Sequence, residues 1–177
     1  MAKANPKPRK GRENTELLTA SSHLYYEFWM LGESLRKLSA VRDQQDVNCA
    51  LESFGIHARV LTDFLFKSSG SEDDILAIDY VDDPQSWGEY ITTKKEIHDY
   101  LRKRVGKEIA HLTYTRLSIE PEGKKWDCAK IHKMITELFL GFLSKVSDDK
   151  LEHKLIIIRD NKEGSGSYPI EKSGLFV

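Results

Sequence analysis

The chain has 177 residues, of which 40% are apolar and 31% are charged, and its formal net charge at pH 7 is −1. This length suits one domain that buries its own core, and the near-zero charge excludes a chain-wide electrostatic affinity for nucleic acids or anionic membranes. The two cysteines, Cys49 and Cys128, lie far apart in the sequence, which argues against a disulfide framework and against a zinc site.

Residues 1–13 combine prolines, a glycine and several basic side chains without an apolar run. This composition predicts a disordered basic tail, which we interpret as a solubilising segment rather than an arm that touches phosphates. We do not interpret this start as a secretory signal, because no uninterrupted apolar region follows it. No apolar stretch approaches the roughly 20 residues that a membrane span requires. We therefore expect a cytoplasmic protein with no membrane partner.

Two long amphipathic helices are predicted next, over residues 14–41 and 45–67. Asn14 can cap the first helix, and Asp43 or Asp46 can cap the second. Apolar residues recur at helical spacing in both, and in the second they form a stripe along its whole length. The members of this stripe are Val47, Leu51, Phe54, Ala58, Leu61 and Leu65.

Residues 68–84 interrupt the helical pattern with serines and a glycine and then carry six acidic side chains. They predict a long acidic connection with one short helical turn, held in place by its apolar residues. Carboxylates suit Mg²⁺ or Ca²⁺, but their spacing fits no known calcium loop, so we interpret them as solvated acids. We expect no metal and no cofactor; a metal-dependent hydrolase that uses this segment is the third hypothesis.

A third long helix is predicted from Thr92 or Thr93 to about Leu117, with Glu96 placed for a capping box. A fourth is predicted from residues 125–127 to about Ser147, with an apolar face wide enough to pack on two neighbours.

The last 30 residues give a weaker pattern. Residues 155–158 form a short apolar run that suits a strand or a helix, and the glycine-rich residues 161–167 predict a loop. The whole pattern predicts an all-α fold: an antiparallel four-to-five-helix bundle over residues 14–147, followed by a partly irregular C-terminal extension over residues 148–177.

The predicted third helix carries the residues with the clearest chemistry. Arg104, Glu108 and His111 are spaced to share one helical face, and Thr115 extends that row by a turn. A guanidinium can hold a phosphate, while a histidine can move a proton to or from a ribose 2′-hydroxyl. Attack by that hydroxyl cleaves RNA without a metal. Glu108 could orient the histidine or pair with Arg104.

Further polar residues could assist such a site. In the predicted second helix, Arg59 and Asp63 form an i, i+4 pair, and His57 lies at the margin of the apolar stripe, where a histidine is more often structural than functional. We expect Arg59, Arg116 and His57 as auxiliary substrate contacts, with Asp63, Glu108 and Thr115 in support.

An arginine followed a few residues later by a histidine, late in an all-helical chain, resembles the motif of the HEPN superfamily. Here the motif is Arg104, six residues and His111. The runs Ala-Leu-Glu-Ser-Phe-Gly-Ile-His-Ala-Arg and Lys-Glu-Ile-Ala-His-Leu-Thr are also similar to a group of bacterial proteins of the same bundle character, over roughly residues 20–145.

The resemblance implies a metal-independent endoribonuclease or toxin-type effector of bacterial defence or toxin–antitoxin systems. Arg104 would bind the scissile phosphate of an RNA, His111 would act as general acid–base, and the site would be composite across a homodimer. The alternative is a non-catalytic module that binds a protein or a nucleotide through the same polar face. The orientation of Arg104 and His111 separates the two, because an arginine paired with an internal acid such as Glu108 indicates a structural role.

Overall fold

The computed structural model describes residues 10–161, and every regular element in this range is helical. The predicted all-α class is confirmed. Residues 1–9 of the predicted tail and residues 162–177 of the predicted extension lie outside the described range. The α-helices are α1 (Asn14–Ala40), α2 (Gln44–Phe66), α3 (Pro84–Thr92), α4 (Lys95–Arg104), α5 (Cys128–Leu143) and α6 (His153–Asp160).

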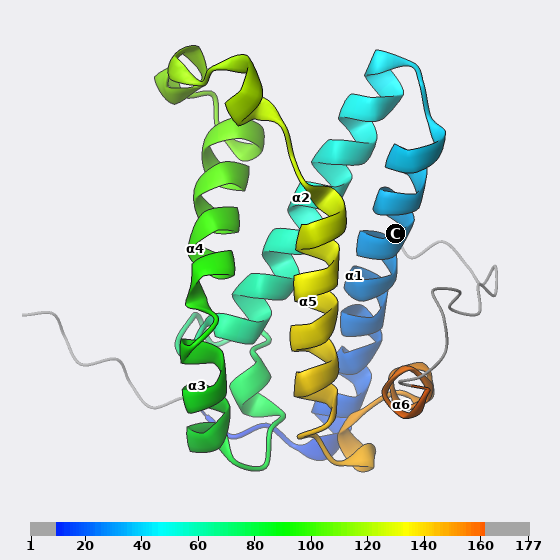
Figure 1. The fold of residues 1–177 in the computed structure, drawn as a ribbon. Helices are drawn as coiled ribbons and strands as arrows, with labels where there is room; N and C mark the ends of the chain where they lie inside the picture. The colour runs from blue at the N-terminus through cyan, green and yellow to red at the C-terminus, as the bar shows by residue number, and fades with distance from the viewer. Residues whose placement is uncertain (1–9, 162–177) are drawn as a thin grey trace, which may run out of the picture.

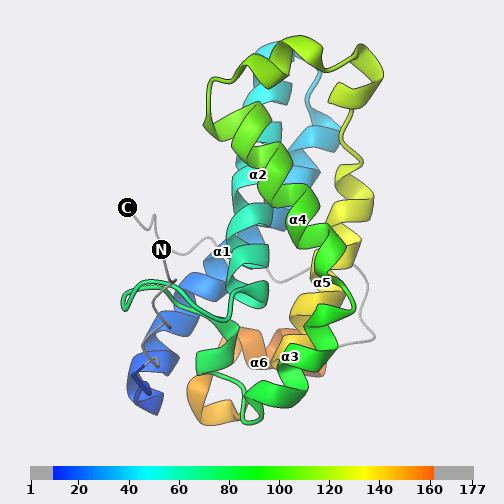
Figure 2. The same ribbon diagram turned by 90° about the vertical axis from the view of Figure 1, so that its left-hand side faces the viewer.

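The four helices α1, α2, α4 and α5 lie side by side, and successive members of this set run in opposite directions (Figure 1). Helix α2 is central, because it contacts α1, α4 and α5. The short helix α3 precedes α4 on the same side of the molecule, and α6 packs across α1 and α5 (Figures 1 and 2). We call the set of helices the helical body.

Carboxylates cap three of the helix starts, and at α3 Asp83 does so by accepting from the backbone N–H of Ser86. The side chain of Asp43 accepts hydrogen bonds from the backbone N–H groups of Gln45 and Asp46 at the start of α2, as predicted. Asp127 accepts one from the N–H of Lys130 at the start of α5. Asn14 was expected to cap α1 but is its first residue, with Glu13 in the cap position.

The helical body encloses a core rich in aromatic side chains. The rings of Phe28 on α1 and Phe139 on α5 stack with their centres 4.6 Å apart. Phe142 on α5 receives the edges of Phe64 and Trp87 at 5.0 and 5.9 Å. All of these residues are at most 4% exposed, so α5 packs on several neighbours, as its wide apolar face predicts.

The acidic connection between α2 and α3 is closely packed. It contains the predicted short turn, a 3₁₀ turn over Ala77–Asp79, and it buries Leu76, Tyr80 and Val81 to 5% exposure or less. The hydroxyl of Tyr80 donates to the carbonyl of Leu17 at 3.0 Å, and Lys150 donates to the carbonyl of Tyr80 at 2.8 Å. The connection is therefore part of the core, while its carboxylates line the surface.

The predicted third long helix is wrong, because the chain forms three pieces there. Helix α4 ends at Arg104, and one π turn spans Val105–Ala110. The backbone is extended at His111, and a 3₁₀ turn over Tyr114–Ser118 follows. The expected capping box is also wrong, since Lys94 precedes α4 without a side-chain cap.

The reason for the early end of α4 lies in packing. The π turn places Ile109 directly against Gly55 of α2. A Cβ added to Gly55 would lie only 2.5 Å from Cδ1 of Ile109, so Gly55 leaves the room that Ile109 occupies. Beyond the turn, Leu112 has the spacing that would place it on the face of Ile97 and Leu101 in a longer helix, but it is 93% exposed. An α-helix in water depends on burial of its apolar face. Residues 111–118 therefore do not continue α4 and form only a short 3₁₀ turn over Tyr114–Ser118.

The C-terminal part is helical as far as it is described. Helix α5 ends at Leu143, earlier than the predicted Ser147, and the ambiguous run at residues 155–158 lies within α6. None of the helices in residues 10–161 is both long and apolar enough to cross a membrane.

Candidate functional site

Arg104, the last residue of α4, is the centre of a half-buried polar cluster. Its Nε and Nη2 atoms donate to the two carboxylate oxygens of Glu108 at 2.7 Å each, and Nη1 donates to the Tyr100 hydroxyl at 2.7 Å. The guanidinium lies 4.4 Å from the ring centre of Trp126. Burial lowers the pKa of Arg104, but the hydrogen bonds to Glu108 and Tyr100 outweigh burial and raise that pKa above its ordinary value.

The same guanidinium ties the segment before α5 to the end of α4. Nη1 donates to the carbonyl of Lys125 at 3.0 Å and Nη2 to that of Gly123 at 2.8 Å. A guanidinium has five N–H donors, and these contacts together with those to Glu108 and Tyr100 use all five. Arg104 therefore keeps no donor for a phosphate in this arrangement, and its contacts are those of a structural anchor.

His111 lies just beyond the π turn and does not continue the helical face of Arg104. Its backbone is extended, with φ −125° and ψ 140°, and its N–H donates to the carbonyl of Gly106 at 3.1 Å. The imidazole is exposed. The expected continuous face through Arg104, Glu108 and His111 is thus wrong, although Arg104 and Glu108 do form the i, i+4 pair.

Arg116 closes the π turn. Its Nε donates to the carbonyl of Lys107 at 3.3 Å and its Nη2 to the carbonyl of Ile109 at 3.2 Å. These are carbonyls at the end of a helical segment, which lack partners within it. Arg116 therefore has a structural contact, while the neighbouring Thr115, expected on the same helical face, is exposed on the segment that follows.

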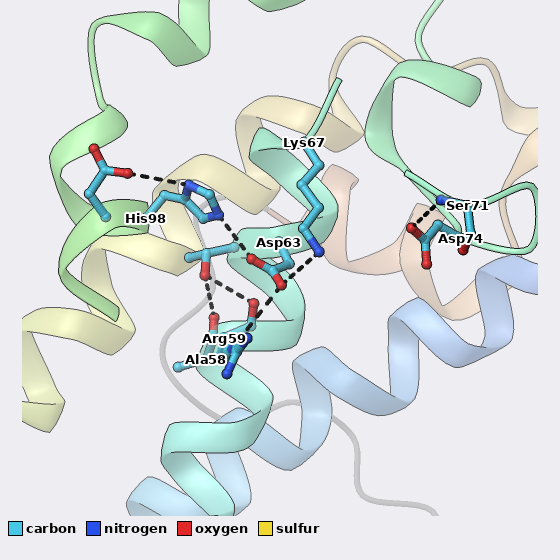
Figure 3. Close-up of polar contacts among 9 residues, drawn as sticks. Ala58, Arg59, Asp63, Lys67, Ser71, Asp74 and His98 are labelled. Atoms are coloured by element: carbon cyan, nitrogen blue, oxygen red, sulfur yellow. Dashed lines mark hydrogen bonds and ion pairs between the residues drawn. The ribbon is translucent and has the colours of Figure 1, made fainter. Parts of the chain in front are cut away.

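A second polar cluster joins α2 to α4 in the middle of the body, and Figure 3 shows Asp63 at its centre. One oxygen of Asp63 is 2.9 Å from Nζ of Lys67, and the other is 2.9 Å from Nε2 of His98. Nε of Arg59 is 3.9 Å from the first oxygen. Burial raises the pKa of Asp63, but the hydrogen bonds from Lys67 and His98 outweigh it, so this pKa lies below its ordinary value.

Sequence reasoning did not assign His98 to a site, yet it is the most buried charged or ionisable side chain of this cluster. Its ring stacks on Phe66 with centres 5.3 Å apart and planes at 9°, and Nδ1 is 3.9 Å from a carboxylate oxygen of Asp99. The i, i+4 pair of Asp63 and Lys67 was a signal of this cluster. The pairing with His98 depends on how α2 and α4 pack, which the sequence pattern does not contain.

His57 lies in a third place, between α1 and α2. Its Nδ1 is 2.7 Å from a carboxylate oxygen of Glu27 on α1, and the ring meets that of Tyr26 edge-on at 5.9 Å. Arg59 is the expected auxiliary residue that approaches the π turn after α4. A Cβ added to Gly106 would lie 3.9 Å from Nη1 of Arg59. The structure therefore separates the expected residues into three clusters and a segment beyond the π turn, which carries His111, Thr115 and Arg116.

The carboxylates of the acidic connection were weighed as metal ligands. Among residues 10–161, no group of three or more His, Cys, Asp or Glu side chains is arranged to hold a metal ion. A carboxylate of this connection can instead accept a local hydrogen bond, as Asp74 does from the backbone N–H of Ser71 at 2.9 Å (Figure 3).

The most unusual surface of the described chain lies on the segment after the π turn. Leu112, Tyr114 and Leu117 are 93%, 90% and 84% exposed, and we call these three side chains the apolar tip. The segment lies at the end of the body where α1 also ends, beyond the last turn of α4 (Figure 1). Other large apolar side chains on the surface of the described residues are about 40% exposed.

Charge is divided between the two ends of the helical body. Residues 102–125, which surround the apolar tip, contain seven Lys or Arg and three Glu; we call them the basic end. Residues 68–93, toward the opposite end, contain seven Asp or Glu and no Lys or Arg. The exposed cations of the basic end are Arg102, Lys103, Lys107, Lys124 and Lys125.

Comparison with models of protein families, with curated proteins and with solved structures gives no match. The resemblance to the HEPN superfamily therefore stays a prediction, and the function has to be argued from the surfaces of this chain.

Proposed function

We propose that the protein is a non-catalytic docking module, built on an antiparallel helical bundle, that binds another protein surface through the apolar tip. The observation that carries this proposal is the exposure of Leu112, Tyr114 and Leu117, each at least 84% accessible within one segment. Single apolar side chains on a surface are ordinary, whereas several together mark interaction sites.

The tip suits a protein partner for a physical reason. Burial of exposed leucine and tyrosine side chains in an interface stabilises the complex by about 25 cal/mol per Å² of apolar area. Tyrosine is also enriched among the residues that dominate binding energy. Removal of the tip would cost the fold little, because its side chains do not contribute to the core. The exposed side chains of the tip are therefore available for binding.

The charges around the tip describe the partner surface. Lys103, Lys107 and Lys124 are exposed on the same basic end, so a partner should be apolar where it meets the tip and acidic around it. Complementary charge of this kind speeds encounter and selects the partner more than it adds affinity. Arg104 fixes the C-terminal part of the same connection by donating to the carbonyls of Gly123 and Lys125.

The docking function can be tested without a known partner. A phage-displayed library of random peptides is selected against the purified chain, and the selected peptides are assayed against the Leu117→Ser variant. We expect peptides with apolar residues flanked by Asp or Glu, whose affinity for the variant falls by about tenfold or more. Equal affinity for the two proteins would overturn the proposal.

Ile56→Ser is the matched control, because Ile56 is 41% exposed on α2 and lies outside the basic end. It loses an apolar side chain of similar size and should bind the selected peptides as the parent does. Loss of binding in both variants would mean that the peptides recognise general surface hydrophobicity and would also count against the tip.

Metal-independent RNA cleavage is the second candidate, and the exposed imidazole of His111 beside the cations of the basic end favours it. In that reaction His111 would take the proton of a ribose 2′-hydroxyl, O2′ would attack the phosphorus, and the P–O5′ bond would break. O5′ would take a proton from water, which leaves a 2′,3′-cyclic phosphate and a 5′-hydroxyl. Lys103 or Lys107 would hold the phosphate, since Arg104 is committed to Glu108.

This candidate has its own test. The parent and its His111→Gln variant are incubated with single-stranded RNA and a chelator, and the ends of the products are identified. Cleavage by the parent with cyclic phosphate ends, lost in the variant, would support it. Absence of cleavage by the parent, or equal cleavage by both proteins, would exclude His111 as a catalytic residue.

A further inference from the structure

A cavity toward the opposite end of the helical body complements the apolar tip. It measures about 460 Å³ and lies between the start of α1 and the acidic connection. Leu17, Ala20 and Ile75 supply apolar lining, and Glu16, Asp73 and Asp79 are among the acids around it. Ile75 is itself 38% exposed, so apolar surface inside the cavity is accessible from solvent.

We infer that the partner of the apolar tip is a second copy of this chain, whose acidic cavity receives the tip head to tail. The inference rests on the docking function proposed above and names its partner. The tip is apolar with basic side chains around it, and the cavity is apolar with acidic side chains around it. The basic side chains are concentrated in residues 102–125 and the acidic side chains in residues 68–93. The volume of about 460 Å³ is sufficient for apolar side chains of the tip.

One cation among the acids of the cavity does not cancel this complementarity. Arg12 donates to Glu16 at 2.7 Å and to the backbone carbonyl of Glu72, so its charge is directed at the wall of the cavity. Four further carboxylates line it, from Glu72, Asp73, Asp74 and Asp79. The local balance is strongly acidic in a chain whose net charge is only −1.

The geometry determines the kind of assembly. The tip is formed by residues 112–117 and the cavity by residues 12–20 with residues 72–79. Because these are different surfaces of one chain, the contact is heterologous and each added copy leaves a free tip and a free cavity. The assembly therefore extends instead of closing as a two-fold dimer. Because the contact joins opposite charges near the surface, added salt weakens it.

The experiment uses sedimentation velocity of the full chain over a range of concentrations at low and high salt. We expect species larger than a dimer that grow with concentration and shrink with salt. A tip variant, Tyr114→Ser with Leu117→Ser, and a cavity variant, Ile75→Lys, should each be monomeric, with association weakened about tenfold or more. Ile56→Ser is the control and should assemble like the parent.

Mixing the two variants provides the decisive arm. The tip variant retains a cavity and the cavity variant retains a tip, so an equimolar mixture should form a one-to-one dimer that cannot grow. If the cavity variant alone associates like the parent, the contact joins tip to tip and the inference is overturned.

A parent chain that stays monomeric at every concentration also overturns the inference. The peptide selection described above would then still decide the docking function, because it does not depend on self-association. Circular dichroism of each variant checks that loss of assembly is not loss of folding.

Discussion

Two long connections of this chain differ in whether their apolar side chains are buried or exposed. The connection between α2 and α3 buries Leu76 and Tyr80 at 2% and 0% exposure and turns its acids outward, whereas the connection between α4 and α5 exposes Leu112 and Tyr114 at 93% and 90%. The first is joined to the body through the Tyr80 hydroxyl and Lys150. The comparison shows that the fold can bury a connection of this kind, so the exposed apolar tip calls for a functional explanation.

The largest expected effect is on the buried connection. Tyr80→Ala removes a fully buried ring and its hydrogen bond to the Leu17 carbonyl, and it should lower the free energy of unfolding by about 3–5 kcal/mol. Urea denaturation followed by circular dichroism measures this change. A loss below about 1 kcal/mol would mean that this connection is not part of the core.

The anchor of the other connection should give an intermediate effect. Arg104→Ala leaves Glu108 half-buried without its cation and releases the carbonyls of Gly123 and Lys125, so stability should fall by about 2–3 kcal/mol. Limited proteolysis should then cut residues 111–125 faster than the acidic connection. If Arg104→Ala leaves the cleavage rate of residues 111–125 unchanged, Arg104 does not hold the connection between α4 and α5 in place.

A smaller, pH-dependent effect is expected in the cluster between α2 and α4. Hydrogen bonds from Lys67 and His98 outweigh burial and hold the pKa of Asp63 below its ordinary value of 3.8, so its ionised form stabilises the fold. This contribution is fully present above the ordinary value and is lost as pH falls through the lower pKa of the folded state.

Thermal unfolding of the parent and of Asp63→Asn as a function of pH tests this sign. The difference in melting temperature should be largest near neutral pH, where about 1–2 kcal/mol separates the two proteins, and should shrink below pH 4. A difference that grows on acidification would contradict the assigned shift.

The smallest effect on stability is expected at the tip. Tyr114→Ser and Leu117→Ser should each change the free energy of unfolding by no more than about 0.5 kcal/mol, as exposed substitutions usually do. The same urea denaturation measures this. A loss comparable to that of Tyr80→Ala would show that the tip packs against the protein in solution and would remove the main argument for docking.

The helical class followed from the sequence wherever a stripe of apolar residues was buried against neighbouring helices. The stripe of α2 from Phe54 to Leu65 and the cap at Asp43 illustrate this, since local spacing and capping are encoded by adjacent residues. The long third helix was mispredicted because Leu112 continues the spacing of Ile97 and Leu101 without a surface to pack on. Periodicity reports where apolar residues would lie in a helix, and tertiary packing decides whether that helix forms.

The candidate site was predictable only in part for the same reason. The Arg104–Glu108 pair follows from i, i+4 spacing, but the use of all five arginine donors depends on Gly123 and Lys125, which are remote in sequence. His98 was not assigned because its partner Asp63 lies on another helix. The apolar tip could not be predicted from the sequence, because leucine and tyrosine at helical spacing are usually core residues and only the structure shows that they are exposed.

The most direct test of the central claim is site-specific photo-crosslinking of the tip in cells that express the chain. Benzoylphenylalanine is placed at position 114, with position 56 on α2 as the control, and covalent products are identified after irradiation. We expect protein adducts at position 114, including adducts with the chain's own residues 72–79, and few at position 56. No protein adduct at position 114, or equal yields at both positions, would contradict the assignment of Leu112, Tyr114 and Leu117 to docking.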